Sequence, residues 1–212
     1  MIYKVIQYIS THADRFTDAL ETHLLLSGIT MVLVILLAVP LGILCAKKES
    51  FEAPIMHVVN ALKVLPVLVL IVVMLPLLGV GFLPALVALL LQAIPIIVIN
   101  TYSGFKNIDP GVLESAVGMG LSKKTIFWKV EFPLAMPLIL TGIRIGAIDV
   151  IAGAMLASYI GGGGLGDFIV NGIDHSDHVM LMVGSIPIAF IAVVVDISLA
   201  LVQRHLSRYQ RS

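Results

Sequence analysis

The chain has 212 residues, of which 59% are apolar and only 12% are charged. Water-soluble domains carry about 25% charged residues, so this composition is typical of a membrane protein. Thirteen basic side chains balance thirteen acidic ones, which leaves no excess positive charge to attract nucleic acid and excludes that class of partner.

The first 22 residues predict an amphipathic helix on the outer surface of the membrane. Apolar side chains recur there at helical spacing, with charged residues between them: Ile2, Val5, Ile6, Ile9, Ala13, Phe16 and Leu20. The stretch lacks the short apolar core and the small-residue cleavage site of a signal peptide. We therefore expect it to anchor the protein at the lipid surface.

Five stretches are long and apolar enough to span a membrane, which takes about 20 residues in a helix. Their predicted limits are residues 24–46, 54–78, 82–102, 137–160 and 179–202. No charged residue separates the second stretch from the third. The uncharged run 64–105 is divided only by the helix-breaking residues Pro76, Gly79, Gly81 and Pro84. The sequence thus predicts a single all-α polytopic membrane domain over residues 1–212, with its termini on opposite sides.

Basic residues in the short flanks predict the orientation, because Lys and Arg accumulate on the cytoplasmic side of membrane proteins. Lys4 and Arg15 are the two on one side. The other side has nine: Lys47, Lys48, Lys106, Lys123, Lys124, Lys129, Arg204, Arg208 and Arg211. We expect a multi-pass protein of the plasma (inner) membrane with its N-terminus outside and its C-terminus in the cytoplasm.

The connection over residues 103–136 is too long for a simple link and contains helix signals of its own. Asp109 and Pro110 form an N-cap and first-turn pair for a helix that would end near Gly118 or Gly120. Ser122 would cap a second helix over residues 123–132, ended by prolines. Two short helices bent at a glycine predict a cytoplasmic docking element.

This connection resembles the EAA loop of ABC importer permeases. The matching string is Glu114-Ser115-Ala116, three residues, Gly120-Leu121, and then Val130-Glu131-Phe132-Pro133 at the family spacing. The resemblance implies a type I ABC importer permease fold. It also implies that Glu114, Ser115, Ala116, Gly120, Leu121 and Pro133 couple the chain to an ATPase.

Further strings make the chain similar to the osmoprotectant permeases, which serve glycine betaine, choline and carnitine. They are Val39 to Gly42, Leu75 to Gly81, Asn100 to Gly104, Gly142 to Arg144, and Ile160 to Asp167. The resemblance implies transport of a quaternary amine delivered by an extracytoplasmic binding protein. Methionine or an ergothioneine-like betaine stays open as the cargo.

The resemblance also implies a dimer of ABC ATPases and a second permease subunit, identical or homologous. We expect no catalytic residue, cofactor or metal in this chain, with ATP and Mg²⁺ bound by the partner ATPase. The Gly161, Gly163, Gly166 spacing imitates a dinucleotide motif, but a span precedes it instead of a β-strand. The alternative to an ABC permease is a protein of another class, either an ATP-independent channel or an intramembrane enzyme.

Two apparent polar sites have simpler explanations. Asp174, His175, Asp177 and His178 could be drawn as a metal site, but their spacing favours a solvated cap for the fifth span. Cys45 is the only cysteine, so it forms neither an intramolecular disulfide nor a thiolate cluster.

Charges inside the spans are the remaining candidates, because each costs about 2.5–3.5 kcal/mol at mid-helix. Arg144 and Asp149 lie roughly 140° apart around one helix, so they are poorly placed to pair. We expect Asp196 to pair across helices and Arg144 to be structural. Asp149, Tyr102, Tyr159 and Gly163 are assigned to the translocation path.

Overall fold

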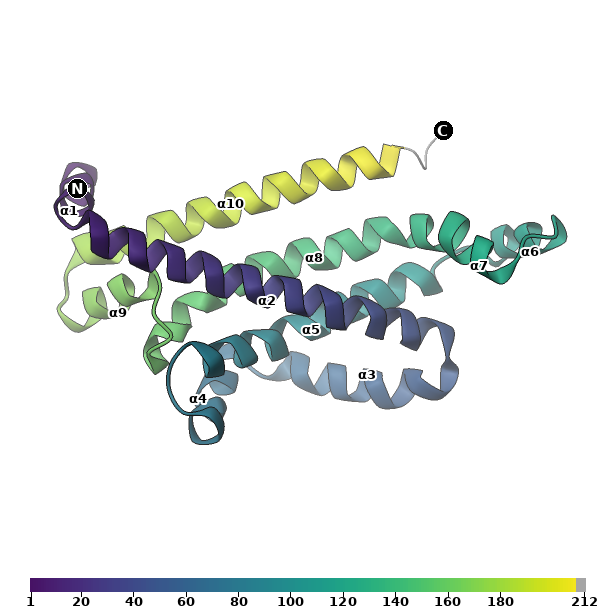
Figure 1. The fold of residues 1–212 in the computed structure, drawn as a ribbon, viewed down its shortest axis with the longest axis horizontal. Helices are drawn as coiled ribbons and strands as arrows, with labels where there is room; N and C mark the ends of the chain where they lie inside the picture. The colour runs from purple at the N-terminus through teal and green to yellow at the C-terminus, as the bar shows by residue number, and fades with distance from the viewer. Residues whose placement is uncertain (209–212) are drawn as a thin grey trace.

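Four long helices lie along the length of the molecule in the computed structural model, which describes residues 1–208 (Figure 1). They are α2 (Ala13–Lys47), α5 (Phe82–Lys106), α8 (Phe132–Ala154) and α10 (His178–Arg208). Each belongs to a helical run long and apolar enough to cross a membrane. Arg211, one of the predicted inner cations, lies outside the described residues.

Helix α5 is the central element, and it packs against α2 on one side and α8 on the other. Small residues allow this close approach. A Cβ added at Gly42 of α2 would lie 2.7 Å from Thr101 of α5, and one at Gly142 of α8 would lie 2.7 Å from Asn100. Helices in a membrane associate through such close contacts between small residues. Lipid is as apolar as the side chains, so moving a side chain from lipid into a helix interface gains little hydrophobic free energy.

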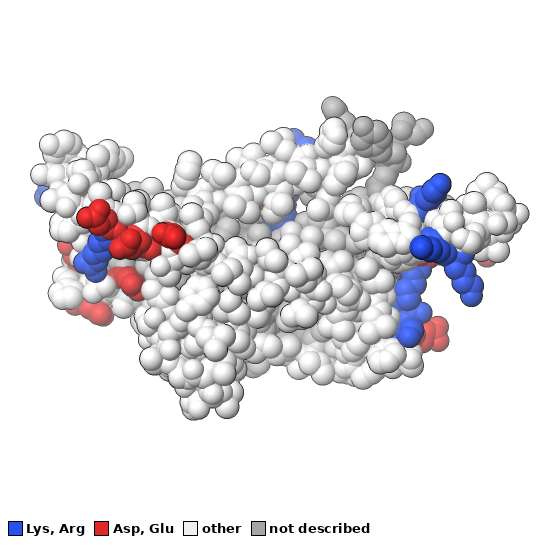
Figure 2. Space-filling model, viewed as in Figure 1, with Lys and Arg blue, Asp and Glu red and all other residues white. Residues whose placement is uncertain are grey.

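The outer faces of these helices are apolar and exposed. Leu36 of α2 is 65% exposed and Phe190 of α10 is 68% exposed. The surface between the two ends of the molecule is almost free of charge, and the charged side chains gather at the ends (Figure 2). This distribution fits a protein whose middle is surrounded by lipid.

The second predicted span is broken, which corrects the expectation of one helix over residues 54–78. Helix α3 (Glu49–Val64) and helix α4 (Val67–Leu78) meet at an angle of 102°. Leu65 precedes Pro66 and has an extended backbone (ψ 123°), because the proline ring disfavours helical angles in the residue before it. Residues 1–208 therefore contain four candidate spans, or five if the bent pair counts as one.

The N-terminal helix is shorter than residues 1–22. Helix α1 (Ile2–Thr11) ends at His12, whose backbone leaves the helical region (φ −124°, ψ 43°), and α2 then begins at Ala13. Residues 13–22 thus extend the first long helix by three turns. Of the predicted apolar face, Val5 is buried against a cluster that includes Phe168, whereas Ile2 and Ile6 are exposed.

The connections at the two ends are themselves helical. At one end lie α6 (Pro110–Gly118), α7 (Lys123–Ile126) and a π-helical turn over Phe127–Glu131. At the other end, α8 continues as a 3₁₀ helix over Met155–Ile160, and α9 (Gly166–Asp174) follows the glycine run. The Asp177 carboxylate accepts a hydrogen bond from the Val179 amide (2.8 Å), which confirms its predicted role in capping the last helix.

Candidate functional site

A knuckle of two short helices, residues 109–131, projects from one end of the molecule beyond the long helices (Figure 1). The Asp109 side chain accepts a hydrogen bond from the Gly111 amide (2.7 Å), which caps α6 at its start. The backbone reverses at Gly120, whose φ is +76°. The Ser122 hydroxyl accepts a hydrogen bond from the Thr125 amide (3.2 Å) and so caps α7. The helix starts and the glycine bend predicted from the sequence are therefore confirmed. The predicted end of the second helix at the prolines is wrong, because the helical run continues through Phe127–Glu131 into α8, which contains Pro137.

The knuckle is attached to the long helices by an aromatic cluster and an ion pair. Phe127 stacks on Phe105 of α5, with ring centroids 5.8 Å apart, and also contacts Trp128 and Phe132. Glu131 is buried and pairs with Lys47 at the end of α2. The buried carboxylate is thus matched by the more exposed Lys47, which joins the base of the knuckle to α2.

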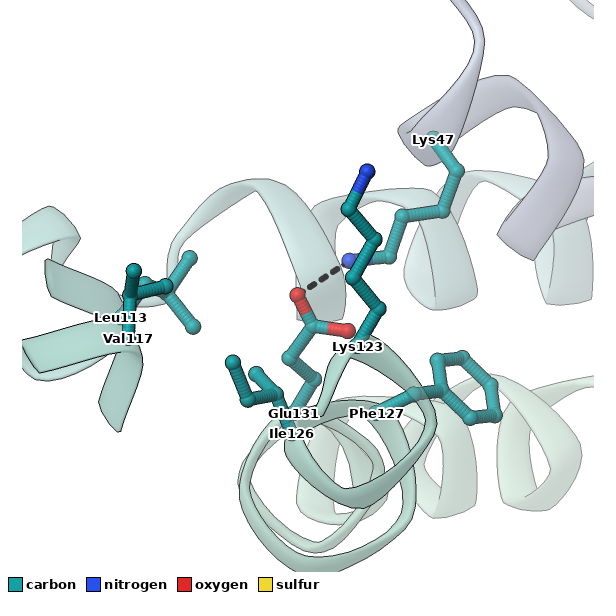
Figure 3. Close-up of a pocket in the computed structure, with 7 residues that line it drawn as sticks. All are labelled: Lys47, Leu113, Val117, Lys123, Ile126, Phe127 and Glu131. Carbon is teal, nitrogen blue, oxygen red and sulfur yellow. Dashed lines mark hydrogen bonds and ion pairs between the residues drawn. The ribbon is translucent and has the colours of Figure 1, made fainter. Parts of the chain in front are cut away.

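A cavity of about 450 Å³ lies inside the knuckle (Figure 3). Leu113 and Val117 of α6 lie on one side of it, and the Lys47–Glu131 pair lies across from them (Figure 3). Most of the residues that line the cavity are apolar residues of the knuckle. The knuckle therefore encloses an open cavity and has no fully packed core.

The predicted coupling residues divide into exposed and buried groups. Glu114, Ser115 and Gly120 are exposed on the knuckle, whereas Leu121 and Pro133 are partly buried. Ala116 is 1% exposed and accepts a hydrogen bond through its carbonyl from the Leu121 amide (3.3 Å). Its small side chain is needed within the knuckle itself, not only at a surface.

Two exposed apolar side chains at the tip were not predicted as contact residues. Val117 is 64% exposed and Met119 is 71% exposed. They flank the Gly118 position at the end of α6. These apolar side chains are exposed at the end of the molecule, outside the nearly uncharged surface between the two ends. Such exposure is typical of a surface that binds a protein partner. Their position just before the glycine bend was the available sequence signal.

Asp149 lines a pocket of about 500 Å³ beside the middle of α5 and the second half of α8. The pocket lies at the bend between α3 and α4, so Leu65, Pro66 and Val67 form part of its wall. Gln92 and Asn100 of α5 and Lys63 of α3 are the other polar residues that line it. Asp149 thus lies in the wall of a cavity between helices that combines polar and apolar residues.

The other three residues assigned to the path lie elsewhere, and none of them lines the Asp149 pocket. The Tyr102 hydroxyl donates a hydrogen bond to Glu52, which also pairs with Lys106 (2.8 Å), near the knuckle end of α5. Tyr159 is 55% exposed in the 3₁₀ turn at the opposite end. Gly163 lies at that same end, where it lines a smaller pocket with Arg15 and Thr22 of α2.

Arg144 pairs with Asp196 of α10, with its Nη2 atom 2.8 Å from Oδ2 and a second contact through Nε. This two-point contact joins α8 to α10 and confirms that Asp196 pairs across helices and that Arg144 is structural. The angular argument that separated Arg144 from Asp149 also holds, because the two side chains have different neighbours.

Comparison with protein families and curated proteins gives consistent matches over nearly the whole chain. Residues 38–212 match the family described as "Binding-protein-dependent transport system inner membrane component". The choline transport system permease protein OpuBB of Bacillus subtilis is 36% identical over 206 residues, covering 97% of this chain and 95% of that protein. The osmoprotectant import permease protein OsmW of Salmonella typhimurium is 34% identical over 200 residues, covering 90% and 91%.

Solved structures share the architecture at lower identity. An inward-facing structure of the MetNI methionine ABC transporter matches with a TM-score of 0.80 at 18% identity, covering 91% of this chain and 96% of that chain. An amino acid ABC transporter solved with histidines matches with a TM-score of 0.74 at 18% identity, covering 96% and 97%. At this identity the likeness establishes the fold alone.

Proposed function

This chain belongs to the binding-protein-dependent transport system inner membrane components, and from that membership we propose that it carries quaternary-amine osmoprotectants across the membrane. It is an ABC transporter permease and not itself an ATPase. Curated relatives named for choline, for glycine betaine, carnitine and choline, and for osmoprotectant import support this cargo class. The methionine transporter shares the fold only, so methionine is the weaker alternative.

The capped and bent knuckle is the single observation that carries the coupling part of the proposal. A binding-protein-dependent system implies an ATPase and a substrate-binding protein as partners. The knuckle projects beyond the apolar belt, presents exposed Val117 and Met119, and is fixed at its base by the Lys47–Glu131 pair. It is the contact for an ABC ATPase dimer, and ATP-driven closure of that dimer moves the long helices through this attachment.

The knuckle end faces the cytoplasm. Helices α2 and α5 finish there with Lys47 and Lys106 in their last turns, and α7 adds Lys123 and Lys124. Figure 2 displays blue side chains gathered at this end. Under the positive-inside rule, the N-terminus and α9 then lie outside, where a binding protein would dock.

The Asp149 pocket is part of the translocation path. One subunit encloses little of a continuous channel, and the pocket's partly open side requires a second permease subunit, identical or homologous, to complete it. A mid-span carboxylate is retained in transporters where it faces water or substrate. Tyr102, Tyr159 and Gly163, away from this pocket, would act at the two ends of the path.

Reconstitution tests this function. The permease, its ATPase and its binding protein are placed in vesicles, and uptake of labelled glycine betaine, choline and carnitine is measured with and without ATP. Uptake of at least one of these amines that requires both ATP and the binding protein supports the proposal. ATP-independent flux would indicate a channel, and ATP-driven uptake of methionine with no amine uptake would assign the alternative cargo.

A further inference from the structure

The pocket beside Asp149 has charged groups of both signs from different helices. Asp149 comes from α8 and Lys63 from the last turn of α3, and both line the same cavity. Among the described residues they form no ion pair with each other or with any third residue. Two opposite charges facing one cavity without a partner are each available to a ligand.

The break in the second span adds a further positive feature. Helix α4 begins at Val67, and the residues at its start, Leu65 to Val67, form part of the pocket wall. The first amide groups of a helix have no acceptor one turn earlier, so they present partial positive charge. Interrupted helices at membrane depth are tolerated where they line a cavity, and their N-termini favour anionic groups.

A buried polar atom without a partner belongs to one of the residues that line the pocket. The Gln92 side-chain oxygen is buried and has no hydrogen-bond partner, and Gln92 lines the same pocket. By contrast, the Asn100 amide is already used, because it donates to the Ile96 carbonyl (2.8 Å). Buried polar atoms of this kind are ordinarily satisfied in folded proteins.

We propose that this pocket is a transit site for a zwitterion, with Asp149 receiving the quaternary ammonium end and Lys63, beside the start of α4, receiving the carboxylate end. The inference rests on the proposed function and narrows its cargo. A quaternary amine with a carboxylate, such as glycine betaine or carnitine, uses both ends of the site. Choline has no carboxylate and uses only Asp149, so the permease itself discriminates between these cargoes.

The test compares cargoes in the reconstituted importer at saturating loaded binding protein. Losing one charge-assisted contact should lower glycine betaine and carnitine uptake by about tenfold in Lys63→Gln, while choline uptake stays within about twofold of wild type. Asp149→Asn should lower the uptake of all three. Lys63→Arg keeps the charge and should retain most glycine betaine uptake. Lys48→Gln removes a lysine outside the pocket and should change nothing.

The outcomes separate this inference from the proposed function. If the wild-type importer carries none of the three amines, the proposed function itself is contradicted. Uptake of glycine betaine that survives Lys63→Gln, or an equal loss of choline and glycine betaine in that variant, overturns the transit site and leaves the function standing. A wild type that carries choline alone also overturns it, whereas one that carries only the zwitterions agrees with it.

Discussion

The charged side chains within the long helices have distinct roles that follow from their partners. Arg144 and Asp196 neutralise each other between α8 and α10, whereas Asp149 meets a cavity. A charge within a membrane protein is tolerated when it is paired or when it reaches water or ligand. The pair is therefore structural, and the unpaired carboxylate is a candidate for transport.

The Arg144–Asp196 pair can be tested by removing each charge alone and both together. Arg144→Leu or Asp196→Leu leaves one charge without its partner in an apolar setting, so each should lower the melting temperature of the detergent-solubilised complex by several degrees. The double variant removes both charges and should regain most of that loss. Additive losses in the double variant would mean that the contact contributes nothing to the packing of α8 on α10.

The environments of the charged and polar residues within the spans could be predicted only in part from the sequence. The depth of Asp149 and its separation from Arg144 follow from counting residues along one helix. Its pocket neighbours could not be predicted, because Lys63 and Gln92 come from other helices and only tertiary packing brings them together. Two buried polar residues of α2, Ser27 and Thr30, were missed for the same reason.

At the scale of elements, local signals determined what could be predicted. The knuckle was predicted because capping residues and a glycine bend act within a few residues of sequence. The α3–α4 break was missed, although Leu65 precedes a proline, because the surrounding apolar run satisfied the length of a single span. Hydropathy reports burial in lipid and does not report the direction of the chain.

The glycine bend of the knuckle gives a prediction that separates coupling from folding. Gly120 has a left-handed backbone and open space around its Cα, so Gly120→Leu strains the backbone by about 1–2 kcal/mol without an internal clash. We expect the subunit to insert in the membrane, while ATPase co-purification and substrate-stimulated ATP hydrolysis fall several-fold.

The matched control is Gly120→Asn, a side chain of similar size that tolerates left-handed angles. It should retain more ATPase coupling than the leucine variant. Normal co-purification and normal stimulation in Gly120→Leu would place the docking surface elsewhere.

The outer glycine run gives a second prediction at this scale. A Cβ at Gly163 would lie 3.3 Å from Thr22 of α2, and φ there is +71°, so Gly163→Val should disturb the loop where it approaches α2. If this loop gates the outer mouth, uptake falls several-fold while the subunits still assemble, as measured by transport assay and gel filtration.

Gly166 is the contrasting position within the same run. A Cβ there would lie 2.1 Å from the Met155 carbonyl oxygen, so Gly166→Ala should disrupt folding and assembly rather than gating. Wild-type uptake in Gly163→Val would reduce the glycine run to a flexible link.

The whole molecule is polarised along its length. One end has the lysines and the knuckle, the other has α1, α9 and the glycine run, and the surface between them is almost uncharged (Figures 1 and 2). An importer needs this polarity, because cargo arrives on one side and ATP is hydrolysed on the other. The pockets follow it, with the Lys47–Glu131 cavity at the knuckle end, the Asp149 pocket between the ends and the smaller Gly163 pocket at the opposite end.

This polarity predicts which end can be labelled from outside the cell. Cys45 is buried, and in a Cys45→Ala background a single cysteine can report one position. Asp174→Cys, exposed at the last residue of α9, should react with a membrane-impermeant maleimide in intact spheroplasts. Ser50→Cys, exposed in the first turn of α3, should react only after permeabilisation, because the basic end is retained in the cytoplasm. Labelling of Ser50→Cys in intact spheroplasts, with Asp174→Cys protected, would reverse the orientation and place the knuckle on the side without ATP, which is incompatible with an ATPase contact there.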